Sequence, residues 1–250
     1  MDISGNTILI TGGNAGIGQA LAIALHNEGN KVIITGRREG ALKETADANP
    51  GMEWRVLDMA DGAAIKAFAT DIIRDFPELN VVVQNAGIMV VEDLTADPVD
   101  LDVPEAIVTT NLLGPLRLTA ALLPHFRRRP AASVVTVSSG LAFVPLAATP
   151  TYNATKAAIH SWSQSLREQL KDTSVDVIEI APPAVATDLM PGHAQNPNSM
   201  LLADFTNEVI ALLKANPKGP EICVERVKFL RDAERNGSYD QVFAMLNAPH

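Results

Sequence analysis

The regular alternation of short β-branched runs with longer segments rich in alanine, leucine and charge constrains the fold of this chain more than any other feature. The runs are apolar almost throughout, as strands buried on both faces of a parallel sheet are. Strands are expected at residues 6–11, 31–35, 54–57, 81–84, 133–137 and 175–180. Six strands that alternate with helices predict an α/β fold, a doubly wound parallel sheet of six or seven strands with helices on both faces.

The segments between the strands place apolar residues at helical spacing. Helices are expected at residues 16–28, 39–48, 63–76, 104–126 and 152–171, with Gly114-Pro115 and Pro124 disturbing the fourth. After residue 180 the pattern changes, because the stretch 188–199 is too long for a simple connector. Further helical segments are expected at residues 202–215 and 223–234, followed by a short tail around residues 239–246. No linker or repeat interrupts the chain, so residues 1–250 are expected to form a single domain with a substrate lid at about 188–215 and a helical C-terminal segment.

Charge and composition exclude several classes of protein. The 250 residues carry 20 Lys and Arg against 29 Asp and Glu, a formal net charge of −9, which argues against a nucleic-acid partner. Cys223 is the only cysteine, so no intramolecular disulfide forms, and the five histidines show no metal-ligand spacing, so no metal is expected. The first residues lack a secretory pattern, and no apolar run reaches the roughly 18 residues of a membrane span. A cytoplasmic protein without a membrane partner is therefore expected.

A glycine-rich turn, TGGNAGIG at residues 11–18, lies between the first expected strand and the first helix. Glycines there let the backbone approach a pyrophosphate, and the helix N-terminus offers free N–H groups and a favourable dipole. The spacing differs from the simple G-x-G-x-x-G fingerprint, so an ordinary tight turn is the alternative. In a strand–turn–helix context the turn predicts a Rossmann-type dinucleotide site. Its candidate cofactor-binding residues are Thr11, Gly12, Asn14, Gly16, Ile17 and Gly18.

The end of the second expected strand reads Gly36-Arg37-Arg38. In nucleotide-binding sheets an acidic residue at this point binds the adenosine ribose hydroxyls, whereas arginine accommodates a 2′-phosphate. Arg37 and Arg38 therefore predict NADP as the cofactor, with NADPH favoured over NADH. The alternative is an ordinary basic loop on the surface.

Three further side chains form a candidate catalytic set. Tyr152 and Lys156 are four residues apart on an expected helix, so they share one face, and Ser139 follows the fifth strand at the edge where open α/β sheets bind ligands. A phenol titrates near 10, and a neighbouring ammonium lowers that pKa. The set suits a carbonyl oxygen that gains a proton while its carbon gains hydride. For a lone Tyr-x-x-x-Lys, an exposed helix pair is the alternative.

Together these motifs resemble the classical short-chain dehydrogenase/reductase family over about residues 5–190, with Asp58, Asn85-Ala86-Gly87 and Asn111 in the family's order. The resemblance implies an oxidoreductase in which Tyr152 is the general acid or base and also contacts the cofactor. It implies that Lys156 lowers the pKa of Tyr152 and binds the nicotinamide ribose. It also implies that Ser139 binds the substrate oxygen and that Asn111 holds a water in the proton relay. The remaining cofactor contacts that it implies are Asp58 and Met59 at the adenine, Asn85, Ala86 and Gly87 beside the ribose, and Val185 and Thr187 at the nicotinamide.

The chain departs from the family where the usual Pro-Gly after the sixth strand is replaced by Pro182-Pro183. Proline has a fixed φ and no N–H, so local geometry is in question more than activity. With this Pro-Pro, the run SSGLAFVPLAATPTYNATKAA at residues 138–158 also resembles a subgroup of bacterial reductases named for an association with D-alanylation of lipoteichoic acid. That name does not identify a substrate.

Three segments are expected to determine the substrate: residues 88–94, 141–148 and 190–202. The second reads LAFVPLAA, which predicts an apolar pocket for a medium-sized ketone or aldehyde, or the matching secondary alcohol. The family resemblance implies a homo-oligomer, a dimer or tetramer. Two other functions remain as alternatives, a cofactor-binding NADP sensor without turnover and a lyase or epimerase. His160 follows Lys156 by one helical turn, and a packed or solvated role is favoured over a catalytic one.

Overall fold

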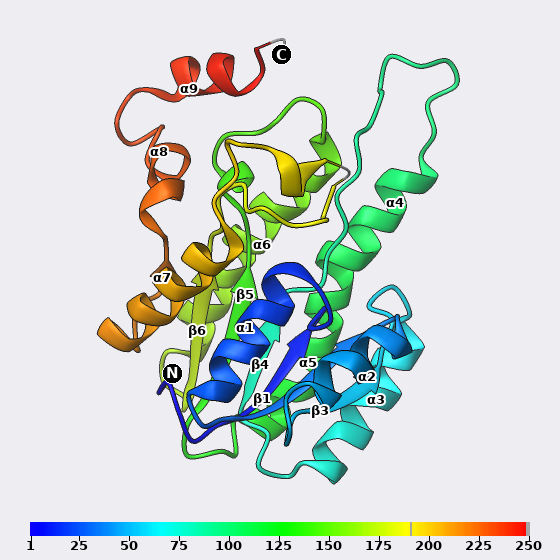
Figure 1. Ribbon diagram of the computed structural model, residues 1–250, viewed down its shortest axis with the longest axis vertical. Coiled ribbons are helices and arrows are strands. Elements are labelled where there is room, and N and C mark those ends of the chain that lie inside the picture. The colour runs from blue at the N-terminus through cyan, green and yellow to red at the C-terminus, as the bar shows by residue number, and fades with distance from the viewer. Residues whose placement is uncertain (191, 249–250) are drawn as a thin grey trace.

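The computed structural model describes residues 1–190 and 192–248, and it confirms the expected α/β fold. In the described residues all strands are parallel and form one seven-stranded sheet in the order β3-β2-β1-β4-β5-β6-β7 (Figure 1). The strands are β1 (Thr7–Thr11), β2 (Lys31–Gly36), β3 (Glu53–Val56), β4 (Val81–Gln84), β5 (Ala132–Val137), β6 (Val175–Ile180) and β7 (Glu221–Ile222).

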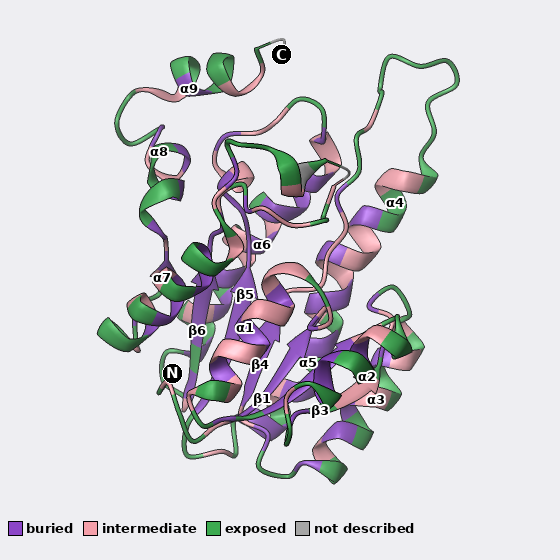
Figure 2. Ribbon diagram, in the orientation of Figure 1, coloured by how far each residue is buried: buried purple, intermediate pink, exposed green. Residues whose placement is uncertain are grey.

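Helices cover both faces of this sheet. Their bounds are α1 (Gly16–Asn27), α2 (Glu39–Asp47), α3 (Gly62–Asp75), α4 (Asp102–Val108), α5 (Gly114–Phe126), α6 (Pro150–Leu170), α7 (Leu202–Ala215), α8 (Lys228–Arg231) and α9 (Tyr239–Leu246). Alternate strand residues enter two cores, as the period of two along a strand requires. One core holds Ile8 and Ile10 with the apolar faces of α1, α2 and α7. The other holds Leu9 with α3, α5 and α6. The central strands are therefore buried throughout (Figure 2).

Three segments differ from the sequence expectation. The expected helix 223–234 is wrong at its start, because β7 and an extended residue precede a 3₁₀ turn at Glu225–Val227 and the four-residue α8. The disturbance expected near Gly114-Pro115 is a π-helical turn, Thr109–Leu113, between α4 and α5. The lid expected at about 188–215 stays a prediction, and its second half is helix α7, which buries Phe205 and Val209 in the core against α1. A lid would be limited to residues 188–201, of which Pro191 lies outside the described residues.

Within the described residues one helical stretch, Asp102–Phe126, is long and apolar enough to cross a membrane by length and composition alone. Its polar residues and prolines interrupt the apolar run, so the sequence expectation missed it. Leu118, Leu122 and Phe126 of this stretch are buried against the sheet and α3, so it serves here as a core helix.

The carboxyl ends of the strands form the edge where the expected site residues gather. The chain runs outward from β1 to β2 and β3, then returns to β4 on the other side of β1 and continues to β7. In open α/β sheets ligands bind outside the carboxyl ends at such a reversal of strand order. Thr11, Gly36, Gln84, Val137 and Ile180 end their strands at this edge.

Candidate active site at the carboxyl edge of the sheet

The glycine-rich turn after β1 is tied to the loop after β4. The buried Thr11 Oγ1 accepts hydrogen bonds from the backbone N–H groups of Asn85 and Ala86, both at 3.0 Å. The Asn85 amide donates back to Thr11 O at 3.0 Å and to Gly12 O at 3.3 Å. Asn85 and Ala86 therefore fix the turn at the centre of the sheet.

Glycine is required in this turn by both conformation and space. Gly12 and Gly16 have φ of +67° and +53°, the left-handed region that glycine tolerates best. Gly18 is buried beneath the turn, and a Cβ there would lie 2.3 Å from Gly12 O and from Asn85 Nδ2. Gly18 thus supports the turn from below, where a pyrophosphate contact was expected. Gly13, not singled out in the sequence, has a packing role too, because its Cβ would lie 2.6 Å from Ile34.

Replacing Gly18 with Ala is expected to lower stability by about 1–3 kcal/mol, because the backbone oxygen of Gly12 and the Asn85 amide must move. The same shift deforms the turn, so dinucleotide affinity should fall as well. Gly40→Ala is the matched control, since Gly40 lies in α2 with nothing within 4 Å of its Cβ position. Thermal unfolding and fluorescence titration with NADPH measure both effects. Equal melting temperatures for the two variants would contradict this account of Gly18.

The N-terminus of α1 faces the end of the β6 loop. No side chain caps α1, because Ala15 occupies the cap position, so its first N–H groups stay available for an anion. A Cβ at Gly16 would lie 3.4 Å from Thr187, which puts Thr187 beside the turn. Val185 is buried and pairs with Met200 across the base of the 188–201 loop. Pro183 adopts no positive φ, so proline fits where the family has glycine.

Arg37 and Arg38 follow β2 and are both exposed. Within residues 1–190 and 192–248 neither guanidinium has an ion pair, so both charges are free for an anionic ligand. Gly36 provides room for Asn14, since a Cβ at 36 would lie 2.4 Å from the Asn14 Oδ1. Asp58 lies two residues beyond the Val56 partner of Gly36, and the buried Met59 packs below it. These residues form the β2–β3 end of the edge.

Asn111 lies in the π-helical turn and is buried. Its Oδ1 accepts from Ile88 N at 2.8 Å, and its Nδ2 donates to Ile88 O at 2.8 Å and to Thr155 Oγ1 at 3.4 Å. Both amide protons are therefore committed to protein atoms. Asn111 joins the loop after Gly87 to α6, and its Oδ1 keeps a lone pair for the water that the resemblance implies.

Ser139, Tyr152 and Lys156 come together above β5. Ser139 begins a 3₁₀ turn, Gly140–Ala142, after the strand, while Tyr152 and Lys156 lie on the first turns of α6. All three side chains are buried. The Lys156 Nζ donates to Val137 O at 2.8 Å and lies 5.5 Å from the centre of the Tyr152 ring. The expected catalytic set is thus assembled at the carboxyl edge.

Burial dominates the protonation of this set. The expected lowering of the Tyr152 pKa by Lys156 is wrong for this structure, because desolvation raises that pKa to about 12 and only a hydrogen bond with Ser139 acts in the opposite direction. Desolvation lowers the pKa of Lys156 to about 8, while the charge of Glu179 acts to raise it. At neutral pH Tyr152 is therefore a neutral phenol, the form that a proton donor requires, and Lys156 is largely charged.

The surroundings of Tyr152 are apolar and come from α4 and from the three segments expected to bind substrate. Met89, Ile107 and Tyr152 form one buried cluster. Packed against it are Ile88, Val103, Leu141, Leu146 and Met190. These side chains offer a largely apolar surface beside the Tyr152 hydroxyl, which suits a largely apolar substrate.

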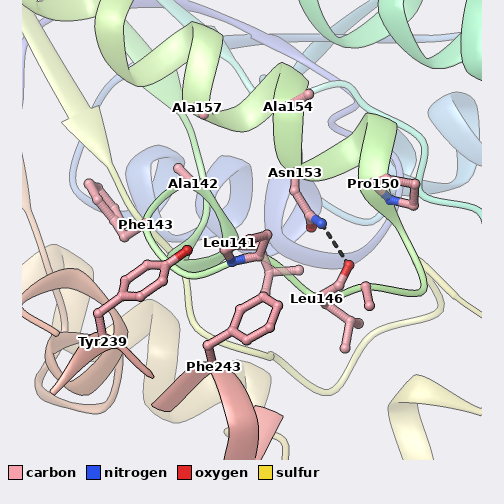
Figure 3. Close-up of a pocket in the computed structure, with 12 residues that line it drawn as sticks. Leu141, Ala142, Phe143, Leu146, Pro150, Asn153, Ala154, Ala157, Tyr239 and Phe243 are labelled. Atoms are coloured by element: carbon pink, nitrogen blue, oxygen red, sulfur yellow. Dashed lines mark hydrogen bonds between the residues drawn. The ribbon is translucent and has the colours of Figure 1, made fainter. Parts of the chain in front are cut away.

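A separate pocket of about 510 Å³ lies behind the 141–147 loop, between that loop, α6 and α9. Its wall includes Ala154 and Ala157, which point to another side of α6 than Tyr152 and Lys156. Tyr239 and Phe243 of α9 project toward the loop (Figure 3). Asn247 accepts a hydrogen bond from Ala147 N and donates one to Pro145 O. None of the catalytic residues lines the pocket, so α9 supports the loop from outside.

A cluster that the sequence did not reveal lies beneath Lys156. His160 is packed as expected, but its Nδ1 bonds the fully buried Glu179 at 2.8 Å. In the described part of the chain His160, Glu179 and Glu221 alone have three potential metal-ligand atoms close together, all within 4.8 Å of one another. The Arg231 guanidinium binds both Glu221 oxygens at 3.0 Å, so this carboxylate already has a cation. The arrangement favours an ion-pair network over a metal site. That the protein binds no metal stays a prediction.

Comparisons with known proteins agree with this geometry. The family model of short chain dehydrogenases matches residues 6–198. DltE, an uncharacterized oxidoreductase of Bacillus subtilis (strain 168), is 42% identical over 250 residues, which cover 99% of this chain and 98% of that protein. A short chain dehydrogenase from Burkholderia cenocepacia in complex with NADP has a TM-score of 0.82 at 22% identity, covering 100% of both chains. One from Burkholderia phymatum in complex with NAD has a TM-score of 0.81 at 19% identity, covering 94% of this chain and 96% of that chain.

Proposed function

The chain belongs to the short-chain dehydrogenase family, and on this basis we propose that it is an NADPH-dependent carbonyl reductase, acting on a ketone or aldehyde or on the matching secondary alcohol. The observation that carries the proposal is the joint burial of Ser139, Tyr152 and Lys156 at the carboxyl edge, beside an apolar cluster. The edge also holds the turn that suits a dinucleotide.

The residues present fit a nicotinamide dinucleotide. The turn at Gly12 and Gly16 has no side chain that would fill it, and the uncapped α1 supplies N–H groups for the pyrophosphate. Asp58 and Met59 would border the adenine, and Asn85, Ala86 and Gly87 the ribose. Val185, Thr187 and Lys156 would contact the nicotinamide half. When bound, this cofactor supplies or accepts the hydride.

The chain's own residues handle the proton. Tyr152, a neutral phenol in its buried site, donates to the carbonyl oxygen during reduction and accepts the proton back during oxidation. Ser139 holds the same oxygen and hydrogen-bonds Tyr152, so the two hydroxyls orient the carbonyl. Lys156 stabilises the phenolate that remains after proton transfer. Asn111 holds α6 in register with the loop after β4.

The apolar lining supports a medium-sized, largely apolar substrate. Consumption of NADPH, and in parallel of NADH, against a panel of ketones and aldehydes tests the proposal. Turnover of apolar carbonyl compounds that prefers NADPH supports it. A panel in which only charged compounds or sugars react would overturn the substrate class.

An NADP sensor without chemistry is the alternative function. Tight NADPH binding with no turnover across the panel would favour the sensor. The buried Tyr152 phenol and Lys156 ammonium argue against it, because a sensor needs neither group. Net cofactor turnover also separates the reductase from a lyase or epimerase. The cytoplasmic location and the homo-oligomer, a dimer or tetramer, stay predictions.

Replacing both Arg37 and Arg38 with Gln is expected to weaken NADPH binding about 10- to 100-fold while leaving NADH binding unchanged. The reason is that free guanidiniums bind the 2′-phosphate, which NADH lacks. Arg127→Gln/Arg128→Gln removes the same charge from the exposed end of α5, away from the site, and should alter neither affinity. Fluorescence titration with both cofactors measures the effect. An equal loss for NADH would refute the assignment.

A further inference from the structure

The His160–Glu179 pair occupies a position that packing alone does not explain. Glu179 lies on β6 and its side chain is fully buried. It shares a sheet face with Val175 and Val177, which pack against α6. A buried carboxylate costs free energy unless it is paired, so a third apolar residue would serve this face better. The charge at residue 179 therefore calls for a partner above it.

His160 fixes this carboxylate from α6. Its Nδ1 lies 2.8 Å from one oxygen of Glu179 and 3.0 Å from the other, while its Nε2 lies 3.1 Å from the Gln164 amide nitrogen. An N–H on Nδ1 that donates to Glu179, with Nε2 accepting from Gln164, satisfies both contacts. The imidazole thus fixes the orientation of the Glu179 carboxylate through its Nδ1.

Lys156 is the buried cation on which this charge acts, although among the described residues the two side chains form no direct ion pair. It precedes His160 by one turn on the same face of α6, and Glu179 is registered with Thr136 on β5, beside the Val137 carbonyl that binds the Lys156 Nζ. The Glu179 charge acts to raise the pKa of Lys156 against the effect of burial. The other titratable side chains near Lys156 on α6 are Tyr152 and His160. From β5, the Val137 backbone carbonyl is an uncharged hydrogen-bond acceptor for the Lys156 Nζ.

Further side chains, from β7, α8 and the 141–147 loop, surround His160 and Glu179. Glu221 of β7 lies 3.7 Å from the His160 Nδ1 and is held by Arg231 of α8. The Arg231 Cζ lies 4.5 Å from the centre of the Phe143 ring. The Phe143 and His160 rings pack edge to face with their centres 4.7 Å apart. The Cys223 thiol, whose pKa burial raises to about 11, is neutral at physiological pH. Arg231 is thus paired with Glu221 and, within the described residues, forms no ion pair with Glu179.

We propose that Glu179, oriented by His160, is a positioning residue for the reaction and acts through Lys156, which lies one helical turn from His160 beside Tyr152. This inference rests on the proposed function for its catalytic consequence, but the pairing itself is measurable without turnover. It adds to the site a carboxylate–imidazole pair beneath the Tyr152 and Lys156 side chains.

The direct test is the titration of Lys156, followed by NMR of protein labelled with ¹³C at the lysine ε-carbon and assigned with Lys156→Met. In wild-type protein the resonance should titrate near pH 8. In Glu179→Gln, which keeps the shape and removes the charge, the midpoint should fall by about one unit. Glu179→Asp keeps the charge and should restore most of the midpoint. Asp176→Asn, a half-exposed carboxyl on the same strand, should leave it unchanged.

Activity supplies the second readout. The rate of carbonyl reduction should fall at alkaline pH as Lys156 loses its proton, and Glu179→Gln should move this limb to lower pH by the same amount. At pH 8 the rate should then be about fivefold lower than wild type. A purely structural role predicts the opposite order of variants, because Gln keeps the shape of Glu and Asp does not.

Thermal unfolding keeps the test decisive if a single variant folds poorly. Lys156→Met leaves the buried charge of Glu179, and Glu179→Gln leaves that of Lys156, without an opposite charge to offset it, so each should melt below the double variant. Simple addition of the two effects, or a Lys156 midpoint unmoved by Glu179→Gln in an active reductase, would overturn the pairing. A protein without any turnover whose Lys156 midpoint still depends on Glu179 would contradict the proposed function and support the pairing.

Discussion

Replacing Tyr152 with Phe is expected to lower the rate of carbonyl reduction by about 10²–10⁴-fold, the contribution of a positioned proton donor. The variant removes one hydroxyl from a side chain that is buried among Met89 and Ile107. The ring and its packing stay, so the protein should fold normally and bind NADPH as before. Single-turnover and steady-state oxidation of NADPH measure the loss.

The chain offers a matched control for this variant, because Tyr239 is its only other tyrosine. Tyr239 lies on α9, stacks on Phe243 and lines the pocket behind the 141–147 loop. Tyr239→Phe makes the same chemical change outside the catalytic set and should leave the rate within about twofold. Comparable losses in both variants, or an unchanged rate in Tyr152→Phe, would remove Tyr152 from the mechanism.

Much of this site can be predicted from the sequence because its parts follow strands with a strong signal. β1, β4 and β5 are nearly continuous apolar runs, so their pattern alone places the turn at residues 11–18, the Asn85 loop and Ser139 at the carboxyl edge. The i,i+4 spacing of Tyr152 and Lys156 places both on one face of α6. Local periodicity is sufficient wherever an element is long and buried.

The remaining features depend on tertiary contacts that local patterns do not encode. The two residues of β7 are too few to show a period, so the sequence pattern of the segment that follows resembles one long helix. The apolar spacing of α7 is real but faces α1, which a lid assignment overlooks. The packing role of Gly18 depends on the Gly12 carbonyl above it. Among these features Glu179 alone can be noticed in the sequence, because it places a carboxylate within the otherwise apolar end of β6.

Ser139→Ala is expected to lower the rate of carbonyl reduction by about 10²-fold or more, the cost of removing a donor aimed at a developing oxyanion. Ser139 is buried, accepts a hydrogen bond from Leu141 N at 3.1 Å and hydrogen-bonds Tyr152. Without that bond, burial alone acts on the Tyr152 phenol, so its pKa should rise further. The loss should appear in kcat more than in NADPH affinity, since the proposed mechanism gives Ser139 a role at the substrate oxygen and not at the pyrophosphate turn.

Ser138 gives the sharpest comparison, because it is the adjacent residue and equally buried, yet its hydroxyl points elsewhere. The Ser138 Oγ donates weakly to Ile180 O at 3.5 Å, and that carbonyl already accepts from Ser138 N at 2.9 Å. Ser138→Ala therefore leaves no unsatisfied group and should keep nearly full activity. Equal losses in the two variants would mean that the β5 end needs both hydroxyls for its structure. A loss confined to Ser139→Ala, with normal unfolding of both proteins, would show that the Ser139 hydroxyl acts in catalysis and that the neighbouring Ser138 hydroxyl does not.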